Sequence, residues 1–158
     1  MMIDLTTPII PYVGTGIFKL DSSYDEVKAL LQEHNISYTE EIWKKTGDFC
    51  PWTVIVICKE GSNPQHSAVE LCFVKNQLFK ICLCEDFEGS LPNGIHTGMN
   101  FNDAWKIDPK LKEDEDWDDV FISPDGYLVE YSNRNLNIII ITVFIPAFER
   151  DDFFEYKW

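Results

Sequence analysis

The chain has 158 residues, enough for one domain, and its hydrophobic content of 45% excludes disorder as a description of the whole chain. Its 27 acidic residues against 13 Lys and Arg give a net charge of -14, which disfavours binding to nucleic acid or to an anionic membrane. A charge of this sign favours a basic protein, or a metal ion, as the partner.

The N-terminal segment lacks the features of a secretory signal. The stretch MMIDLTTPIIPYVGTG has no basic region, and Pro8 and Pro11 interrupt its apolar residues. The longest apolar run, at 138–145, is too short to span a bilayer. We therefore expect a cytoplasmic protein that does not contact the membrane.

The first half of the chain predicts a short strand at 16–20 and then a helix. Residues 22–35 place Tyr24, Val27 and Leu30 at helical spacing, and Ser22 or Ser23 can cap the N-terminus. We expect the preceding Gly-Thr-Gly, at 14–16, to be a flexible segment that leads into the first strand, because it lacks the Lys-Ser/Thr ending of a phosphate-binding loop.

Patterns of period two follow the helix and predict antiparallel strands at 37–43, 52–60, 68–74 and 78–84. A tight turn is expected at Asn76, between the last two of these strands. Simple alternation places Leu78, Lys80, Cys82 and Cys84 on one side of the final strand.

The second half of the chain repeats this pattern after a linker at 85–94. Residues 95–108 align without gaps on residues 18–31, so that Phe101 falls on Tyr24 and Ala104 on Val27. Pro109 ends the second helix, and strands are expected at 119–124, 126–132 and 136–145.

The expected fold class is therefore α+β, with a single domain over residues 1–158. Two weakly similar strand–helix–strands units, about 16–84 and 94–145, form a mostly antiparallel sheet with the helices packed on one face. An acidic and aromatic tail, residues 148–158, closes the chain.

The sequence offers no catalytic, metal or cofactor motif. His34, His66 and His96 share no local motif with a Cys, a Ser or a carboxylate. The pair Cys82 and Cys84 could suggest a metal site, but no second Cys or His pair follows at zinc-ligand spacing. The odd count of 5 cysteines, among them Cys50, favours core or surface thiols over a disulfide framework.

Acidic residues concentrate in one short run, KLKEDEDWDDV at 110–120. One interpretation is a solvated loop that keeps the molecule soluble. Another is that Trp117 is tucked into the core at the start of the next strand. The third is an interface in which Trp117 is an anchor surrounded by negative charge. The candidate binding residues are Asp114, Glu115, Asp116, Trp117, Asp118 and Asp119.

The tail carries a second acidic patch, with Asp151, Asp152 and Phe154 as further candidate contacts. Its aromatic residues are costly to leave in water, so we expect them to pack on the domain, on a partner or on a second copy of the chain. A tight inhibitor of a basic protein would use both patches, because attraction between oppositely charged surfaces accelerates association.

Several motifs resemble those of small bacterial immunity proteins of polymorphic toxin systems, including contact-dependent growth inhibition. They are LPNGI at 91–95 with Gly98-Met99, DPKL at 108–111, WDD at 117–119, SPDGY at 123–127 and the isoleucine-rich strand at 136–145. GIFKLDSSYDEVKALL, at 16–31, resembles the opening strand–helix unit of that family. The acidic run and the aromatic tail depart from the family pattern.

The resemblance implies a protein that performs no chemistry and binds one cognate toxin domain, often a nuclease, by covering its active site or substrate surface. Two alternatives stay open. The chain could be a small acidic hydrolase that uses paired carboxylates, which would require a pocket with convergent perturbed carboxylates. It could also be a scaffold that forms oligomers through its FFEYKW tail.

Overall fold

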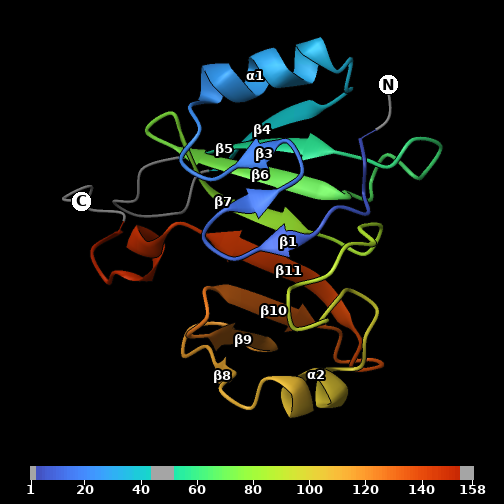
Figure 1. The fold of residues 1–158 in the computed structure, drawn as a ribbon, viewed down its shortest axis with the longest axis vertical. Coiled ribbons are helices and arrows are strands. Elements are labelled where there is room, and N and C mark those ends of the chain that lie inside the picture. Colours follow the sequence, from blue (N-terminus) through green and yellow to red (C-terminus); the bar gives the residue numbers. More distant parts are fainter. Residues whose placement is uncertain (1–2, 44–51, 154–158) are drawn as a thin grey trace.

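A computed structural model describes residues 3–43 and 52–153 of the chain, so that Cys50 and Phe154 lie outside the described residues. The fold is mixed α+β, as the sequence predicts. It consists of an antiparallel sheet of 8 strands, in the order β4-β5-β6-β7-β11-β10-β9-β8, and a small sheet of 3 strands, β1-β2-β3 (Figure 1).

Each predicted unit contributes four consecutive strands to the large sheet. The first unit supplies β4 (Thr39–Trp43), β5 (Trp52–Ile57), β6 (Val69–Val74) and β7 (Gln77–Leu83). The second unit supplies β8 (Lys112–Glu113), β9 (Val120–Ser123), β10 (Tyr127–Tyr131) and β11 (Ile138–Phe144). The final strands of the two units, β7 and β11, pair antiparallel at the centre and so join the units.

Helix α1 (Tyr24–Glu33) is shorter than the predicted range, because its end groups fix the boundaries. Ser23 and Glu26 form a reciprocal capping box at its N-terminus, and Val27 and Leu31 face the core. Asn35 follows the helix with φ 52°, the left-handed conformation that commonly ends a helix.

Helix α2 (Phe101–Ile107) begins at the residue that the repeat aligns with Tyr24, and the Asn100 side chain caps it. Asp108 is its C-cap residue, and Pro109 follows, as predicted. Neither helix in the described part of the chain is long and apolar enough to cross a membrane.

The internal repeat extends to the backbone hydrogen bonds that join each helix to the last strand of its unit. In each unit three bonds connect the residues before the helix to the start of that strand. In the first unit they are Asp21 N–H to Leu78 O, Leu78 N–H to Ser22 O and Tyr24 N–H to Asn76 O; in the second they are Gly98 N–H to Ile138 O, Ile138 N–H to Met99 O and Phe101 N–H to Leu136 O. The two units therefore share one local architecture.

Equivalent β-bulges lie just after these hydrogen bonds in the two units. Because of the bulge in β7, the alternation predicted for that strand is wrong. Phe73 pairs with Leu78 and Cys72 pairs with Lys80, so that the extra residue Phe79 puts Leu78 and Lys80 on opposite faces. In the second unit the same shift lies between Glu130 and Tyr131. A bulge inserts one residue without changing the hydrophobic pattern, so sequence alternation does not reveal it.

The small sheet, made of β1 (Ile9–Ile10), β2 (Gly14–Thr15) and β3 (Phe18–Lys19), was only partly predicted. The Gly-Thr-Gly segment, expected to be flexible, supplies the central strand β2. Gly14 has φ 135°, and a Cβ atom there would lie 2.2 Å from the Phe18 carbonyl oxygen. Glycine is therefore required at this position by the close approach of β3.

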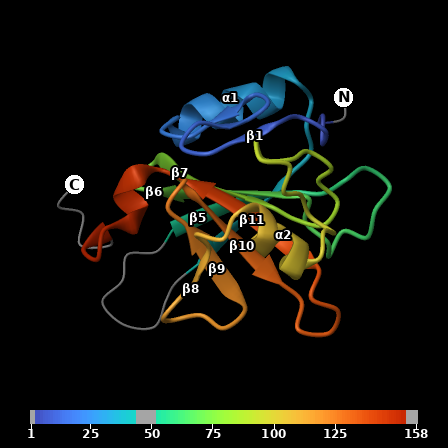
Figure 2. The ribbon, with the colours of Figure 1, turned by 60° about the horizontal axis from the view of Figure 1, so that its bottom comes forward.

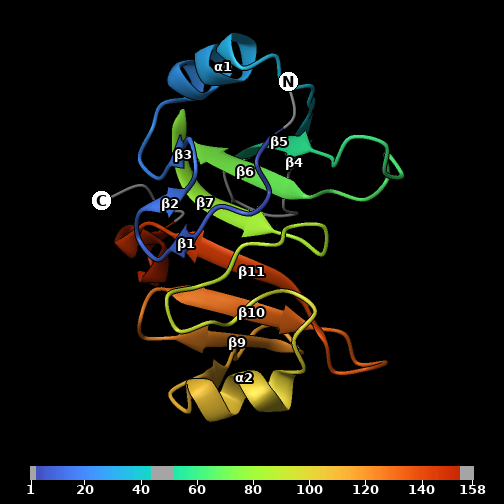
Figure 3. The same cartoon turned by 45° about the vertical axis from the view of Figure 1, so that its right-hand side comes forward.

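Both α-helices and the small sheet lie on one face of the large sheet (Figures 1 and 2). Tyr24 of α1 contacts Phe73 edge to face, with ring centroids 5.4 Å apart. Phe101 of α2 packs on Phe121 and Tyr131 at 4.5 and 4.8 Å. Each helix thus covers its own unit, α1 over β4–β7 and α2 near β8–β10 (Figure 3).

A buried carboxylate fastens α2 to the sheet. Asp108 Oδ2 accepts hydrogen bonds from the hydroxyls of Ser123, at 2.6 Å, and Tyr127, while Oδ1 accepts one from the Lys110 N–H at 3.2 Å. Burial opposes ionisation of this carboxyl, but the three hydrogen bonds outweigh it and hold the pKa of Asp108 below its usual value.

We expect Asp108→Asn to lower the free energy of unfolding by about 1–3 kcal/mol at neutral pH, because an amide cannot accept all three bonds. Since the folded-state pKa of Asp108 is depressed, its contribution is present above the unfolded pKa of about 3.9 and is lost as the pH falls through the folded pKa. Urea unfolding between pH 3 and 7 measures both effects; a variant as stable as wild type at pH 7 contradicts this account.

Leu136 adopts φ 60°, the left-handed conformation that Asn76 adopts with φ 61° at the equivalent position of the first unit. Leucine is strained there and asparagine much less so. We expect Leu136→Asn to raise the free energy of unfolding by about 0.5–1 kcal/mol, whereas Leu136→Ala, which keeps the strain, does not. Chemical denaturation of both variants measures this; equal destabilisation by the two would contradict it.

Candidate binding surface

The predicted acidic run forms the loop between β8 and β9, and residues 114–119 are called the acidic loop below. Asp114 Oδ1 accepts hydrogen bonds from the backbone N–H groups of Asp116, at 2.8 Å, and Trp117, at 3.1 Å. The Asp114 N–H donates to the Val120 carbonyl at 2.8 Å and closes the hairpin. The side chain of Asp114 therefore orders the turn on which the other carboxylates are displayed.

The four residues at the tip of the acidic loop, Glu115, Asp116, Trp117 and Asp118, are exposed. The Trp117 side chain is 63% exposed, so the interpretation that placed it in the core is wrong. The turn fixed by Asp114 places Trp117 in the loop that precedes β9, outside the core. The tip thus presents a large aromatic side chain flanked by three carboxylates.

Asp119 lies at the base of the acidic loop and differs from the tip. It is half-buried and has φ 62°, and its carbonyl oxygen accepts a hydrogen bond from the Tyr131 N–H at 3.1 Å. Burial and a hydrogen bond to the Asp119 carboxylate raise the pKa of the Tyr131 hydroxyl. Asp119 therefore anchors the loop to β10 in addition to contributing charge.

The second predicted patch lies after the 3-10 helix η1 (Pro146–Glu149). Asp152 accepts a two-point ion pair from Arg150, at 2.8 and 2.9 Å, which offsets its charge. Asp151 is exposed, whereas Phe153 is buried with Phe148 against Phe79, at ring distances of 5.2–5.7 Å. The tail as far as Phe153 thus packs on its own domain.

The two acidic patches do not come together. Val120, which follows the acidic loop, pairs with Glu130 near one end of β10, whereas Val143, just before η1, pairs with Tyr127 at the other end. The length of β10 separates these ends by about 15 Å, and Figure 1 shows η1 on the opposite side of the sheet from the turn that follows β10. The two patches therefore lie near opposite ends of β10.

The acidic loop borders the face of the large sheet that carries no α-helix. The open face is defined as the side opposite the two α-helices; at its centre it carries Val54, Val56, Glu70, Cys72, Lys80, Cys82, Leu128, Glu130, Ile140 and Thr142. Glu130 is half-buried, and burial together with the charges of Asp119 and Glu70 raises its pKa. The negative field of the loop therefore extends to the open face.

Sequence reasoning missed the cluster of Lys80, Cys72 and Cys82 at the centre of the open face. A Lys inside an apolar strand was the available signal, but only the pairing of β6 and β7 brings these three side chains together. No group of His, Cys, Asp and Glu that could hold a metal ion occurs among residues 3–43 and 52–153. Cys58, Cys72, Cys82 and Cys84 are free thiols.

Two mainly apolar cavities lie near the N-terminal segment, and a more polar one of about 610 Å³ lies along α1, with Asp25 and Lys28 among its lining residues. One of about 280 Å³ is lined by Phe18, His34, Val69 and Phe87. A second, of about 470 Å³, has Asp4, Glu60 and Glu88 among its lining residues. Hydrogen bonds from Thr6 lower the pKa of Asp4, which is the reverse of what a general acid requires.

Comparison with known proteins gives a likeness of fold. No protein-family model matches the chain, and no curated protein matches its sequence. The crystal structure of the uncharacterized protein yfeY from Escherichia coli is similar with a TM-score of 0.50 and 15% sequence identity, over 85% of this chain and 98% of that chain. At this identity the likeness concerns the fold alone.

Proposed function

We propose that the protein is an immunity-type binding protein that neutralises a basic toxin domain, of the nuclease class, by covering its active site or substrate-binding surface. It would act in the cytoplasm and perform no chemistry of its own. The observation that carries this proposal is the exposed Trp117 at the tip of an ordered acidic loop. The motifs that resemble those of immunity proteins support the same class.

The physical argument rests on complementary charge. A nuclease surface is basic because its substrate is a polyanion. The carboxylates of the acidic loop can take the positions of phosphates on that surface, and the net charge of -14 raises the rate of encounter with a cationic partner.

Trp117 would supply the apolar part of the contact. Tryptophan is enriched among the residues that dominate binding free energy, and it loses little conformational freedom on binding. The turn held by Asp114 lowers the ordering cost further, because the loop backbone is already fixed by hydrogen bonds in the free protein. Carboxylates at the rim of the contact would raise the association rate, and the aromatic side chain at its centre would raise the affinity.

The test partner is the C-terminal domain of the protein encoded immediately upstream, purified as an inactive variant. Titration calorimetry is expected to show a one-to-one complex, and co-expression of the chain is expected to protect cells from the active domain. Failure of both would contradict the proposed function.

Reversing two tip charges, Asp116→Lys with Asp118→Lys, should slow association with that domain about tenfold or more at low ionic strength. The difference should shrink as salt is added, because salt screens exposed charges. Stopped-flow fluorescence measures the association rate.

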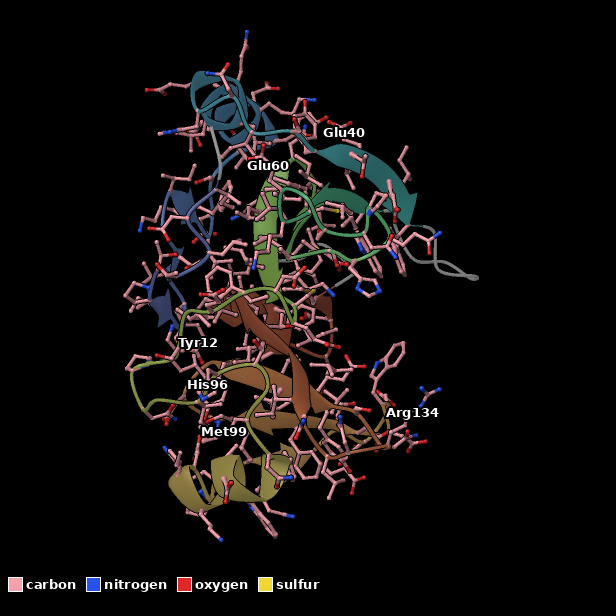
Figure 4. The ribbon with its side chains drawn as sticks, turned by 90° about the vertical axis from the view of Figure 1, so that its right-hand side faces the viewer. Tyr12, Glu40, Glu60, His96, Met99 and Arg134 are labelled. Atoms are coloured by element: carbon pink, nitrogen blue, oxygen red, sulfur yellow. The ribbon has the colours of Figure 1, made fainter. Side chains whose placement is uncertain are left out.

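The matched control is Glu33→Lys with Glu60→Lys, which makes the same charge change at two exposed positions outside the acidic loop. Arg134 lies in the turn that follows β10, and Figure 4 shows Glu60 far from it. Equal slowing by both pairs would remove the acidic loop from the interface.

Truncation of the anchor, Trp117→Ala, should weaken the complex by about 2 kcal/mol or more. Because the side chain is 63% exposed, the free energy of unfolding should stay within about 0.5 kcal/mol of wild type. Calorimetric binding and denaturant unfolding, done on the same preparations, separate the two effects. Unchanged affinity, or a loss of stability as large as the loss of affinity, would contradict the anchor role.

A further inference from the structure

Strand β4 (Thr39–Trp43) forms one edge of the large sheet and pairs with β5 on its inner side. All 5 of its residues are exposed. Among residues 3–43 and 52–153, no strand pairs with its outer side. An exposed edge strand presents unpaired N–H and C=O groups, so that a strand of another chain can extend the sheet.

The two edges of the large sheet differ in how they are protected from such pairing. At the opposite edge, β8 has only 2 residues, one of them Lys112, and it leads into the acidic loop. β4 is longer, contains no lysine or proline, and pairs with β5 without a bulge. Short length, lysine, proline and bulges are the features that keep edge strands from pairing. Of these two edges, β4 is therefore the one that can accept a further strand.

Two large side chains make the β4 edge apolar. Ile42 is 69% exposed, the highest value for a large hydrophobic residue in the described part of the chain, and Trp43 is 52% exposed. Burial of this surface against another strand would stabilise a complex.

The two carboxylates of β4 are each held by a group of the same chain. Glu40 lies beside α1 and accepts hydrogen bonds from the Tyr24 hydroxyl, at 2.7 Å, and from the Lys28 ammonium group (Figure 4). Glu41 lies on the other face of the strand and accepts a hydrogen bond from the Trp43 indole N–H at 3.0 Å. Neither carboxylate is therefore an isolated charge on this edge.

We propose that β4 is a dimerisation edge, and that it pairs antiparallel with β4 of a second copy of this chain about a two-fold axis. Such an axis keeps the two faces of the sheet, so residues that oppose each other across it come from the same face. With the axis at Ile42, the two Ile42 side chains form a central apolar pair, and Glu41 opposes Trp43 of the second copy. A carboxylate thus meets an indole between the chains, as it does within one chain.

The other registers are less favourable. A two-fold axis at Glu40 or Glu41 sets a carboxylate directly opposite its own copy, and like charges in that position are destabilising. An axis at either end of the strand, at Thr39 or Trp43, leaves most of β4 outside the pairing. The order of charged and apolar residues along the strand therefore selects the register centred on Ile42.

The proposed dimer does not depend on the proposed toxin contact, because β4 and the acidic loop belong to opposite edges of the sheet. One short strand from each copy buries less surface than the roughly 1,200 Å² of a stable complex, so we expect a weak dimer with a dissociation constant in the micromolar range. Each copy carries a net charge of -14, which opposes association. Added salt should strengthen the dimer, because it screens this repulsion.

Disulfide capture tests both the edge and its register. Directly opposed residues of antiparallel strands have Cβ atoms about 4.5–5.5 Å apart, which is near the separation that a disulfide requires. Under mild oxidation with oxidised glutathione, Ile42→Cys should form a covalent dimer at least about tenfold faster than Val13→Cys, an exposed control in the turn between β1 and β2. Glu41→Cys, which would oppose Trp43, should be captured more slowly than Ile42→Cys. The wild-type chain gives the background from its native cysteines.

Sedimentation equilibrium of the full chain, from micromolar to millimolar concentration, measures the dimer without any crosslink. Wild type should show a monomer–dimer equilibrium that shifts toward the dimer as salt is added. Ile42→Lys should be monomeric, because the axis then sets two ammonium groups opposite each other, whereas Val13→Lys should retain the equilibrium. Circular dichroism verifies that both variants are folded.

Three results would overturn the proposal. They are a wild-type chain that stays monomeric at millimolar concentration and high salt, a dimer that survives Ile42→Lys, and capture of Ile42→Cys no faster than that of Val13→Cys. Hydrogen exchange at β4 distinguishes the other possible occupant. Protection that appears only when the toxin domain is added would assign the edge to a strand of the toxin instead of a second copy.

Discussion

The antiparallel pairing of β7 with β11 is the constraint on which the rest of the structure depends. Each unit is a helix followed by a four-stranded meander, and a meander of that size would expose its last strand as an edge. Pairing these two last strands buries both edges, places the strands that carry Cys82 and Thr142 at the centre, and leaves β4 and β8 at the outside. The acidic loop is displayed because its hairpin forms one of those outer edges.

Charge is distributed unevenly over this frame. The helix-covered face buries its one strongly hydrogen-bonded carboxylate, Asp108, between α2 and the sheet. The open face keeps Glu70, Glu130 and Lys80 partly accessible, and the acidic loop continues this charge past the end of β9.

The two units differ where function is proposed and share the contacts that join each helix to its strand. The hydrogen bonds that fasten each helix to its strand are equivalent, and so are the left-handed residues Asn76 and Leu136 and the bulges beside them. The backbone hydrogen bonds among these features join each helix to the last strand of its unit. The acidic loop, in the hairpin between β8 and β9, lies outside these hydrogen bonds.

The sequence by itself determined the fold class, most strands of the large sheet, the presence of both helices and the repeat, because hydrophobic period and capping residues are local properties of the chain. It also located the carboxylates of the acidic loop. Only the tertiary structure decided that Trp117 is exposed, that Phe153 is buried and that Leu78 and Lys80 face opposite ways. Burial depends on which distant strands lie nearby, and a bulge such as that at Phe79 shifts the register without a mark in the pattern. The side chains of Cys72, Lys80 and Cys82 meet only through the bulged pairing of β6 with β7, and Thr142 joins them from β11, which is distant in the sequence.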